Sequence, residues 1–188
     1  IPVAHLQGGE VSGSIDDKVR NAVTMLADVH FPATHAAFAR VAALVSWPAS
    51  VCMAGCPSID LALRAQHEPP VTTQELGGAG VDIDTPHPWI VCLQHPVTSE
   101  AHDAGAQMTE TLRALTAFER YRILVFWPGE DAGAGAMSKV IRQSQAPVEW
   151  LHTVRNLPPS RFLRLLTQAS VLVGNSSAGI RECSALGV

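Results

Sequence analysis

Short apolar runs alternate along the chain with longer stretches in which apolar positions recur at helical spacing. The runs predict strands at residues 3–6, 28–31, 51–54, 89–94, 123–127, 148–151 and 171–174. The longer stretches predict helices at residues 16–26, 35–44, 58–65, 100–118, 134–144, 159–169 and 177–186. Several runs are apolar throughout, as is typical of strands that helices cover on both faces. The pattern predicts an α/β fold with parallel sheets.

The periodic pattern breaks between residues 66 and 88, where proline and glycine clusters replace it. This composition is typical of a linker or a long surface loop. We therefore expect one α/β lobe in residues 1–66, a connection in residues 67–88 and a second lobe in residues 89–188. Two lobes joined in this way predict a cleft, which is the usual place for a ligand.

Composition and charge describe a packed globular chain. Of its 188 residues, 47% are hydrophobic and 16% are charged, and the formal net charge is -4. A slightly acidic chain lacks the basic face that a general nucleic-acid binder needs. No apolar run approaches the roughly 20 residues that span a bilayer. We therefore expect neither nucleic acid nor a membrane as a partner.

The cysteines and the chain ends add further expectations. The four cysteines, at positions 52, 56, 92 and 183, lack the paired short spacings of a structural zinc site and read as buried apolar residues. No signal-type leader is visible, which favours a reducing, cytoplasmic setting. The chain opens on Ile1-Pro2 and closes on Gly187-Val188 within apolar patterns, so we expect it to be part of a longer protein.

A first group of polar residues lies in residues 4–20, where a predicted strand passes through a glycine-rich turn into a helix. Ser14 fits the N-cap, and Asp16 and Arg20 have the spacing of a helical ion pair. The alternative is functional: Glu10, Asp16 and Arg20 would converge on a polar ligand that the glycines allow to approach the backbone. The pattern leaves both interpretations open.

Two further groups follow later strands. In a functional role, His95 would donate a hydrogen bond to a phosphate or act as an acid or base. In a structural role, it would cap neighbouring backbone groups. Ser176 and Ser177 begin a predicted helix, whose N-terminus is a ready anion site. Arg181 and Glu182 lie about one turn further on, where they would contact a phosphate or sugar and ribose hydroxyls. The alternative there is an ordinary N-cap with a surface ion pair.

Other polar and aromatic residues favour structural roles. The segment 126–133 is explained by turn chemistry, and the tryptophans are scattered in a way that suits packing. His30 falls in a predicted strand, where a structural and a functional role both fit. We expect exposed positions for four other histidines: His67, His87, His102 and His152.

Five motifs, in this order, resemble the UDP-N-acetylglucosamine 2-epimerase family, especially its hydrolysing branch, which supplies N-acetylmannosamine for sialic acid synthesis. They are GGEVSGSIDD at residues 8–17, AGCPS at 54–58, QHPVT at 94–98, DAG at 131–133 and GNSS followed by GIRE at 174–182. The resemblance implies two Rossmann-like lobes of the GT-B type with a UDP-sugar between them. It also implies a homo-oligomer, a dimer or a tetramer, and no metal or redox cofactor.

The resemblance implies that a base removes the C2 proton of the sugar while the C1–O bond to UDP breaks, which gives a 2-acetamidoglucal that water then attacks. Asp16 would be the catalytic carboxylate, Arg20 would orient the sugar or a neighbouring acid, and His95 would contact the phosphates and protonate the leaving group. Substrate binding is implied for four more residues: Ser176 and Ser177 at the diphosphate or sugar, Arg181 at the sugar, and Glu182 at the ribose.

The chain also departs from the family pattern. Gln7 stands in the substrate site where close relatives often have a catalytic glutamate, so Glu10 takes over, substrate handling differs, or activity is poor. Gly129 replaces a common asparagine, and Asn21 and Asp28 replace common histidines. Three alternatives therefore stay open: the non-hydrolysing reaction, a related UDP-2-acetamido sugar as substrate, and a catalytically silent nucleotide-sugar-binding fragment.

Overall fold

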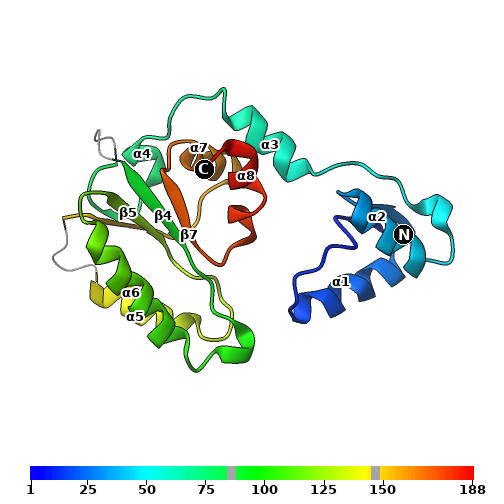
Figure 1. Cartoon of the computed structure of the whole chain (residues 1–188), viewed down its shortest axis with the longest axis horizontal. Coiled ribbons are helices and arrows are strands. Elements are labelled where there is room, and N and C mark those ends of the chain that lie inside the picture. The colour runs from blue at the N-terminus through cyan, green and yellow to red at the C-terminus, as the bar shows by residue number, and fades with distance from the viewer. Residues whose placement is uncertain (84–87, 145–148) are drawn as a thin grey trace. The chain divides into compact units, whose positions relative to one another are not determined.

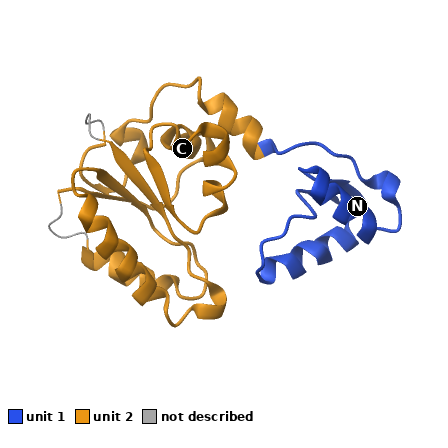
Figure 2. Cartoon of the chain, in the orientation of Figure 1, with its two compact units in different colours: residues 1–57 blue, residues 58–188 orange. Residues whose placement is uncertain are grey.

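A computed structural model describes residues 1–83, 88–144 and 149–188 of the chain (Figure 1). The chain forms two compact units, Ile1–Pro57 and Ser58–Val188 (Figure 2). Both carry parallel strands flanked by helices, so the predicted α/β class is confirmed. The division between the units at residue 57 comes earlier than the expected boundary at residue 66, which lies inside the second unit.

The first unit is a small parallel ribbon with two helices. Its elements are β1 (Ala4–Leu6), α1 (Ile15–Leu26), β2 (Val29–Phe31), α2 (His35–Leu44) and the single turn η1 (Pro48–Ser50). β1 pairs with β2 in parallel, with His5 opposite His30. The strand predicted at residues 51–54 is reduced to one bridge, between Val51 and His30. Ser14 and Thr34 cap the helices, because their side chains accept backbone N–H groups of the first turns.

The second unit contains a five-stranded sheet in the order β3-β6-β5-β4-β7, parallel except for β3. Its strands are β3 (Ala79–Gly80), β4 (Trp89–Leu93), β5 (Arg122–Phe126), β6 (Leu151–Val154) and β7 (Val171–Gly174). Its helices are α3 (Pro57–Ala65), α4 (Thr73–Leu76), α5 (Ala104–Leu115), α6 (Ala134–Ser144), α7 (Pro159–Leu166) and α8 (Glu182–Leu186), with single turns η2 (Thr98–Glu100), η3 (Thr116–Phe118) and η4 (Ser177–Gly179).

Helices cover both faces of this sheet, and alternate strand residues supply the two cores (Figure 1). Ile90 and Cys92 of β4 point to one face and pack in a cluster with residues of α5 and α6. Trp89 and Val91 point to the other face, where the cluster includes residues of α4, α7 and α8. Burial on both faces is why these strands read as continuous apolar runs.

The strand order reverses at β4. β5 and β6 follow it on one side, whereas β7 pairs with its other edge. In open parallel sheets, the loops that leave the two neighbouring strands at such a reversal diverge from each other. Ligands bind in the crevice between these loops, at the carboxyl ends of the strands. A ligand site is therefore expected at the loops after β4 and β7.

Strand β6 corrects the sequence prediction, which placed a strand at residues 148–151. The strand occupies Leu151–Val154; residue 148 lies outside the described residues. Its interior holds His152 and Thr153, which are 3% and 1% exposed, so the prediction that His152 is exposed is wrong. His152 lies inside the sheet because its two ring nitrogens are 2.8 Å from the carbonyl oxygen of Val81 and 2.7 Å from that of Gly77.

Other histidines and the cysteines have mixed outcomes. His67 and His102 are exposed as expected, His30 is 2% exposed, and His87 lies outside the described residues. All four cysteines are free; Cys92 and Cys183 are buried, Cys56 is half-buried and Cys52 is exposed. The prediction that all four are buried is therefore correct for Cys92 and Cys183, only partly met at Cys56, and wrong for Cys52, which follows the bridge at Val51 where the predicted strand ends early.

The segment 67–88 has more structure than a linker. It contains α4, with Thr72 and Glu75 forming a reciprocal capping box, and β3, which pairs with β6. Arg164 of α7 holds this segment: it donates to both Glu75 carboxylate oxygens and to the carbonyls of Pro69 and Pro70. Residues 84–87 of the expected linker lie outside the described part of the chain.

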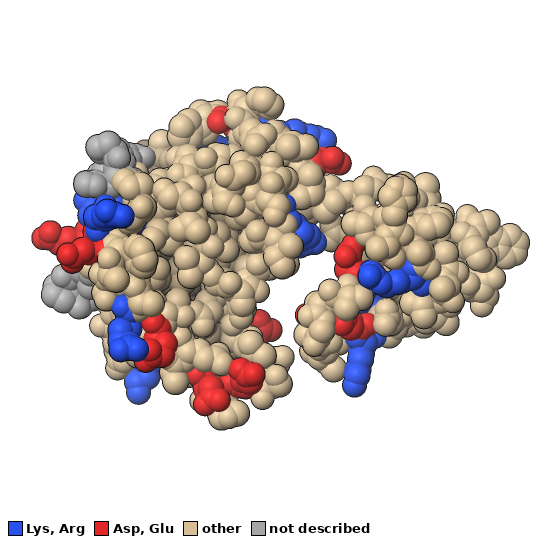
Figure 3. All heavy atoms as spheres, in the orientation of Figure 1, with Lys and Arg blue, Asp and Glu red and all other residues tan. Residues whose placement is uncertain are grey.

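The described helices and surface add two observations. None of the helices in residues 1–83, 88–144 and 149–188 is both long and apolar enough to cross a bilayer. Charged side chains of both signs lie in small groups separated by uncharged surface on the face shown in Figure 3.

Candidate functional site

The turn after β1 is built by unusual backbone at Gln7 and Gly9. Gln7 has a φ of 59°, a left-handed conformation that is rare for residues other than glycine. Gly9 has a φ of 80°, and a Cβ there would lie 2.4 Å from the carbonyl oxygen of Ala37 on α2. Arg40 of α2 donates to the Gly9 carbonyl at 2.8 Å. Only a glycine at position 9 lets the turn pack this closely against α2.

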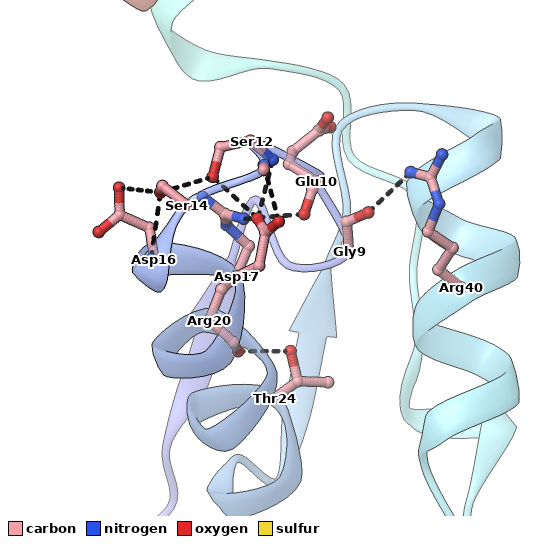
Figure 4. Close-up of polar contacts among 10 residues, drawn as sticks. Gly9, Glu10, Ser12, Ser14, Asp16, Asp17, Arg20, Thr24 and Arg40 are labelled. Carbon is pink, nitrogen blue, oxygen red and sulfur yellow. Dashed lines mark hydrogen bonds and ion pairs between the residues drawn. The ribbon is translucent and has the colours of Figure 1, made fainter. Parts of the chain in front are cut away.

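Asp17 organises the loop that leads from this turn into α1 (Figure 4). Its carboxylate accepts from the backbone N–H and hydroxyl of Ser12 and from the Gly13 N–H, each at 2.8 Å. Arg20 donates to the same carboxylate at 2.6 Å and to the Glu10 carbonyl at 2.8 Å. The pKa of Asp17 lies well below its usual range, chiefly because the Ser12 N–H and hydroxyl stabilise the ionised form.

Asp16 lies outside this network and corrects the expected ion pair. Arg20 pairs with Asp17, three residues earlier, rather than with Asp16. The Asp16 side chain is exposed and accepts from the Ser14 hydroxyl at 3.0 Å. Among the residues drawn in Figure 4, it contacts only Ser14. A carboxylate that is not held by a cation is available to act as a base.

His5 lies beneath the turn and was not singled out from the sequence. Its Nδ1 is 3.1 Å from the hydroxyl of Thr24, which itself donates to the Arg20 carbonyl at 3.0 Å. The single hydroxyl proton is therefore used, so we assign the Nδ1 proton to a neutral His5 that donates to Thr24. Burial, followed by the proximity of His30 and Arg20, lowers the pKa of His5, which favours this neutral ring.

In the second unit, His95 and Asn175 join the two loops at the strand reversal. The backbone N–H of His95 donates to Asn175 Oδ1 at 2.7 Å, and Asn175 Nδ2 donates to the His95 carbonyl at 2.8 Å. Gly174, just before, has a φ of 144°, and a Cβ there would lie 2.0 Å from the Leu93 carbonyl oxygen. The loop after β7 therefore lies directly against the loop after β4.

The turn after Asn175 carries the hydroxyls expected to bind an anion. Ser176 accepts from the Ala178 N–H at 3.3 Å, and Arg181 Nη2 donates to Ser177 Oγ at 3.2 Å. The predicted helix at residues 177–186 is in fact two pieces, η4 and α8, which Ile180 and Arg181 separate. Ser176 thus caps a single turn rather than a long helix.

Glu182 is a buried carboxylate with an unfilled hydrogen-bonding position. The residue is 8% exposed, and its Oε2 has no hydrogen-bond partner among the described residues. The nearest cationic atom, Arg181 Nε, is 4.0 Å away. A buried carboxylate oxygen is normally hydrogen-bonded, so this one has capacity to accept from a ligand hydroxyl.

A cavity of about 550 Å³ opens beside His95. It lies at the carboxyl ends of β4, β5 and β6 and has the size of a small-ligand pocket. Its lining residues are Leu93, His95, Phe126, Trp127, Pro128, Gly129, Ser138, Arg142, Arg155 and Asn156. Arg142 lies 5.7 Å from the centre of the Trp127 ring. The sequence missed Arg155 and Asn156 because β6 was placed three residues too early, which hid the loop that follows it.

The predicted site residues therefore fall into two groups. Gln7, Glu10 and Arg20 surround the turn after β1, with Asp16 at its edge. The other group, His95, Ser176, Ser177, Arg181 and Glu182, surrounds the strand reversal in the second unit. Within the described residues, no group of three or more His, Cys, Asp or Glu side chains is arranged to hold a metal ion.

Solved structures with the same fold are UDP-GlcNAc 2-epimerases. The Neisseria meningitidis enzyme bound to UDP-GlcNAc matches all of this chain and 51% of its own, with a TM-score of 0.73 and 13% identity. The Methanocaldococcus jannaschii enzyme in complex with UDP-GlcNAc and UDP matches all of this chain and 52% of its own, with a TM-score of 0.70 and 12% identity. These likenesses establish the GT-B-type α/β fold.

Curated relatives carry related names. A "UDP-N,N'-diacetylbacillosamine 2-epimerase (hydrolyzing)" of Legionella pneumophila is 27% identical over 98% of this chain, and a "UDP-N-acetylglucosamine 2-epimerase" of Neisseria meningitidis is 28% identical over 99%. The chain spans about half of their length, 47% in each case. The family model described as UDP-N-acetylglucosamine 2-epimerase matches residues 1–188. The chain therefore belongs to the UDP-N-acetylglucosamine 2-epimerase family.

Proposed function

We propose that the protein is a hydrolysing UDP-N-acetylglucosamine 2-epimerase that releases free N-acetylmannosamine. The observation that carries this proposal is the exposed Asp16 carboxylate, which Arg20 leaves unpaired by binding Asp17 instead. Elimination of UDP from the sugar needs a base at C2, and an unpaired carboxylate beside a glycine-rich turn suits that role. The name of the Legionella relative supports the hydrolysing branch.

In the proposed reaction Asp16 takes the C2 proton, the C2–H electron pair forms the C1–C2 double bond, and the C1–O pair leaves with UDP. Water then adds to the 2-acetamidoglucal, with hydroxide at C1 and a proton at C2 on the opposite face. Gln7 cannot exchange protons at neutral pH, so Glu10 supplies the second acid–base group in this scheme. Arg20 orients the sugar.

We propose that the second unit binds UDP. His95 and the Ser176–Ser177 turn contact the diphosphate and Arg181 the sugar side, while the open Glu182 oxygen accepts from the ribose hydroxyls. The cavity lined by Trp127, Arg142 and Arg155 extends this site. In this proposal residues 1–66 and 89–188 belong to the two lobes, and the protein is a cytoplasmic dimer or tetramer.

A second candidate is an epimerase of a related UDP-2-acetamido sugar. The Legionella relative is named for a diacetylated sugar, which differs from N-acetylglucosamine in its substituents. The departures at Gln7 and Gly129 change the lining of both groups of site residues, which is where such a difference would be accommodated.

Product analysis of the full-length protein tests these functions. Incubation with UDP-GlcNAc should give free N-acetylmannosamine and UDP in equal amounts. UDP-N-acetylmannosamine without free UDP would instead indicate the non-hydrolysing reaction. Turnover of UDP-N,N'-diacetylbacillosamine alone would support the second candidate, and saturable UDP binding with no turnover of either sugar would indicate a silent binding protein.

A further inference from the structure

The amide of Asn175 makes both backbone hydrogen bonds of His95, a residue 80 positions away in the sequence. We call this pair of bonds the Asn175 clamp. Its two distances, 2.7 and 2.8 Å, are those of well-formed hydrogen bonds. The Asn175 side chain thus fixes His95, in the loop after β4, to the loop that follows β7.

The clamp begins where regular pairing of the strands ends. Leu93 opposite Gly174 is the last register pair of β4 and β7. The positive φ of Gly174 turns the chain out of the strand. An asparagine side chain carries a donor and an acceptor, as a peptide group does, so Asn175 continues the ladder by one further rung.

We propose that Asn175 is a positioning residue: it sets the separation between His95 and the Ser176–Ser177 turn and thereby the affinity for the diphosphate of UDP. This inference rests on the proposed function of the site. Ser176 follows Asn175 directly and caps η4, so a movement at residue 175 displaces the hydroxyls. Both polar groups of the Asn175 side chain are engaged by His95, so its effect on the ligand is indirect.

Two variants of the full-length protein test the clamp by UDP titration calorimetry. Asn175→Ala removes both bonds, whereas Asn175→Asp keeps the acceptor for the His95 N–H but turns a carboxylate oxygen toward the His95 carbonyl. Each lost bond should weaken UDP binding by about five- to tenfold, and turnover should suffer mainly through KM. Gln66→Glu, at an exposed position, adds the same charge as the aspartate variant and should bind UDP as the wild type does.

Amide hydrogen exchange at His95 gives a readout that does not depend on activity. Exchange should speed up in Asn175→Ala, which removes the acceptor of the His95 N–H, and less in Asn175→Asp, which keeps it, while thermal unfolding stays cooperative in both variants. If Asn175→Ala bound UDP with wild-type affinity, the inference would be overturned. This holds even if Asn175→Asp bound UDP more weakly, because the added charge alone would then explain the loss. Absence of UDP binding in the wild-type protein would instead remove the proposed function and this inference with it.

Discussion

Asp16 and Asp17 are sequence neighbours with different surroundings. The Asp17 carboxylate accepts hydrogen bonds from Ser12, Gly13 and Arg20. Within the described residues, the Asp16 carboxylate accepts a side-chain hydrogen bond from the Ser14 hydroxyl alone. We expect Asp16→Asn to lower kcat by at least about 100-fold, because the base is lost, while UDP affinity is retained. Steady-state kinetics and UDP titration measure the two quantities. Turnover like that of the wild type would remove Asp16 from the mechanism.

Gln7 offers the opposite experiment, the addition of a carboxylate. Its side chain donates to Cys56 Sγ at 3.3 Å, and its backbone is held by a bond from its N–H to the Phe31 carbonyl. Gln7→Glu is nearly isosteric, so the strained turn should persist. Because Glu10 supplies the second acid–base group in the proposed scheme, we expect kcat in steady-state assays to change little. A several-fold rise in kcat would show instead that a missing acid limits the reaction and that Glu10 does not serve.

The cysteines differ enough to be told apart chemically. Burial raises the pKa of the Cys92 thiol to about 12, while Cys52 is exposed. Because the thiolate is the reactive form, we expect iodoacetamide to alkylate Cys52 in the folded protein and to reach Cys92 only after unfolding. Mass spectrometry of peptides from native and urea-treated protein checks this order. Early labelling of Cys92 would contradict the burial of β4.

Among the elements, the end of β7 is the most sensitive to a single methyl group. Gly174→Ala places a Cβ against the Leu93 carbonyl at a φ that L-residues avoid, so we expect the free energy of unfolding to fall by at least about 2 kcal/mol. Gly135→Ala is a matched control: its Cβ meets no atom within 4 Å and it lies in α6, where alanine should stabilise by about 0.5–1 kcal/mol. Urea denaturation of both variants measures these changes. A shift of the two urea midpoints in the same direction and by the same amount would contradict this account.

The contact between α4 and α7 should respond to pH. Hydrogen bonds from Arg164 lower the pKa of the Glu75 carboxyl to about 2. Because the pKa is lower in the folded state, this contact stabilises the fold above the ordinary glutamate range and loses its effect as the pH falls toward 2. Glu75→Gln should therefore lower the urea midpoint more at about pH 6 than at about pH 3. Equal effects at both values would argue against the ion pair.

Elements whose apolar residues follow a regular helix or strand pattern could be predicted from the sequence, whereas elements that depend on contacts with residues far away in the chain could not. α2 and α6 match their predicted bounds because apolar residues at helical spacing are buried in each of them. β7 also matches its predicted bounds: its apolar run marks the strand although none of its residues is fully buried. β6 was displaced because His152 is buried by bonds to carbonyls more than 70 positions away, which no local pattern reveals. The Asp16–Arg20 spacing is that of a helical ion pair, but the Asp17 carboxylate is fixed by Ser12, and Arg20 pairs with Asp17 instead.

At the scale of the whole molecule, the two units differ in how much apolar surface they bury. The described second unit contains three clusters of buried apolar side chains. Residues 1–57, all of which are described, bury far fewer apolar side chains: Pro32, Ala37, Val41 and Val51. In the 188-residue chain, we expect amides of β1 and β2 to exchange with an opening free energy at least about 2 kcal/mol below those of β4 and β5. Native-state hydrogen exchange measures both, and equal protection would show a shared core.

The Asn175 clamp also has a consequence for the order in which the chain acquires its structure. β4 and β7 are neighbours in space but are separated in the chain by three helical crossovers, through α5, α6 and α7, so their pairing closes a long loop. Contacts between distant residues carry the largest loop-closure cost and usually form late in folding. Recovery of UDP affinity during refolding should therefore lag behind recovery of the helical circular dichroism signal. UDP binding would then report the last step in the folding of the second unit.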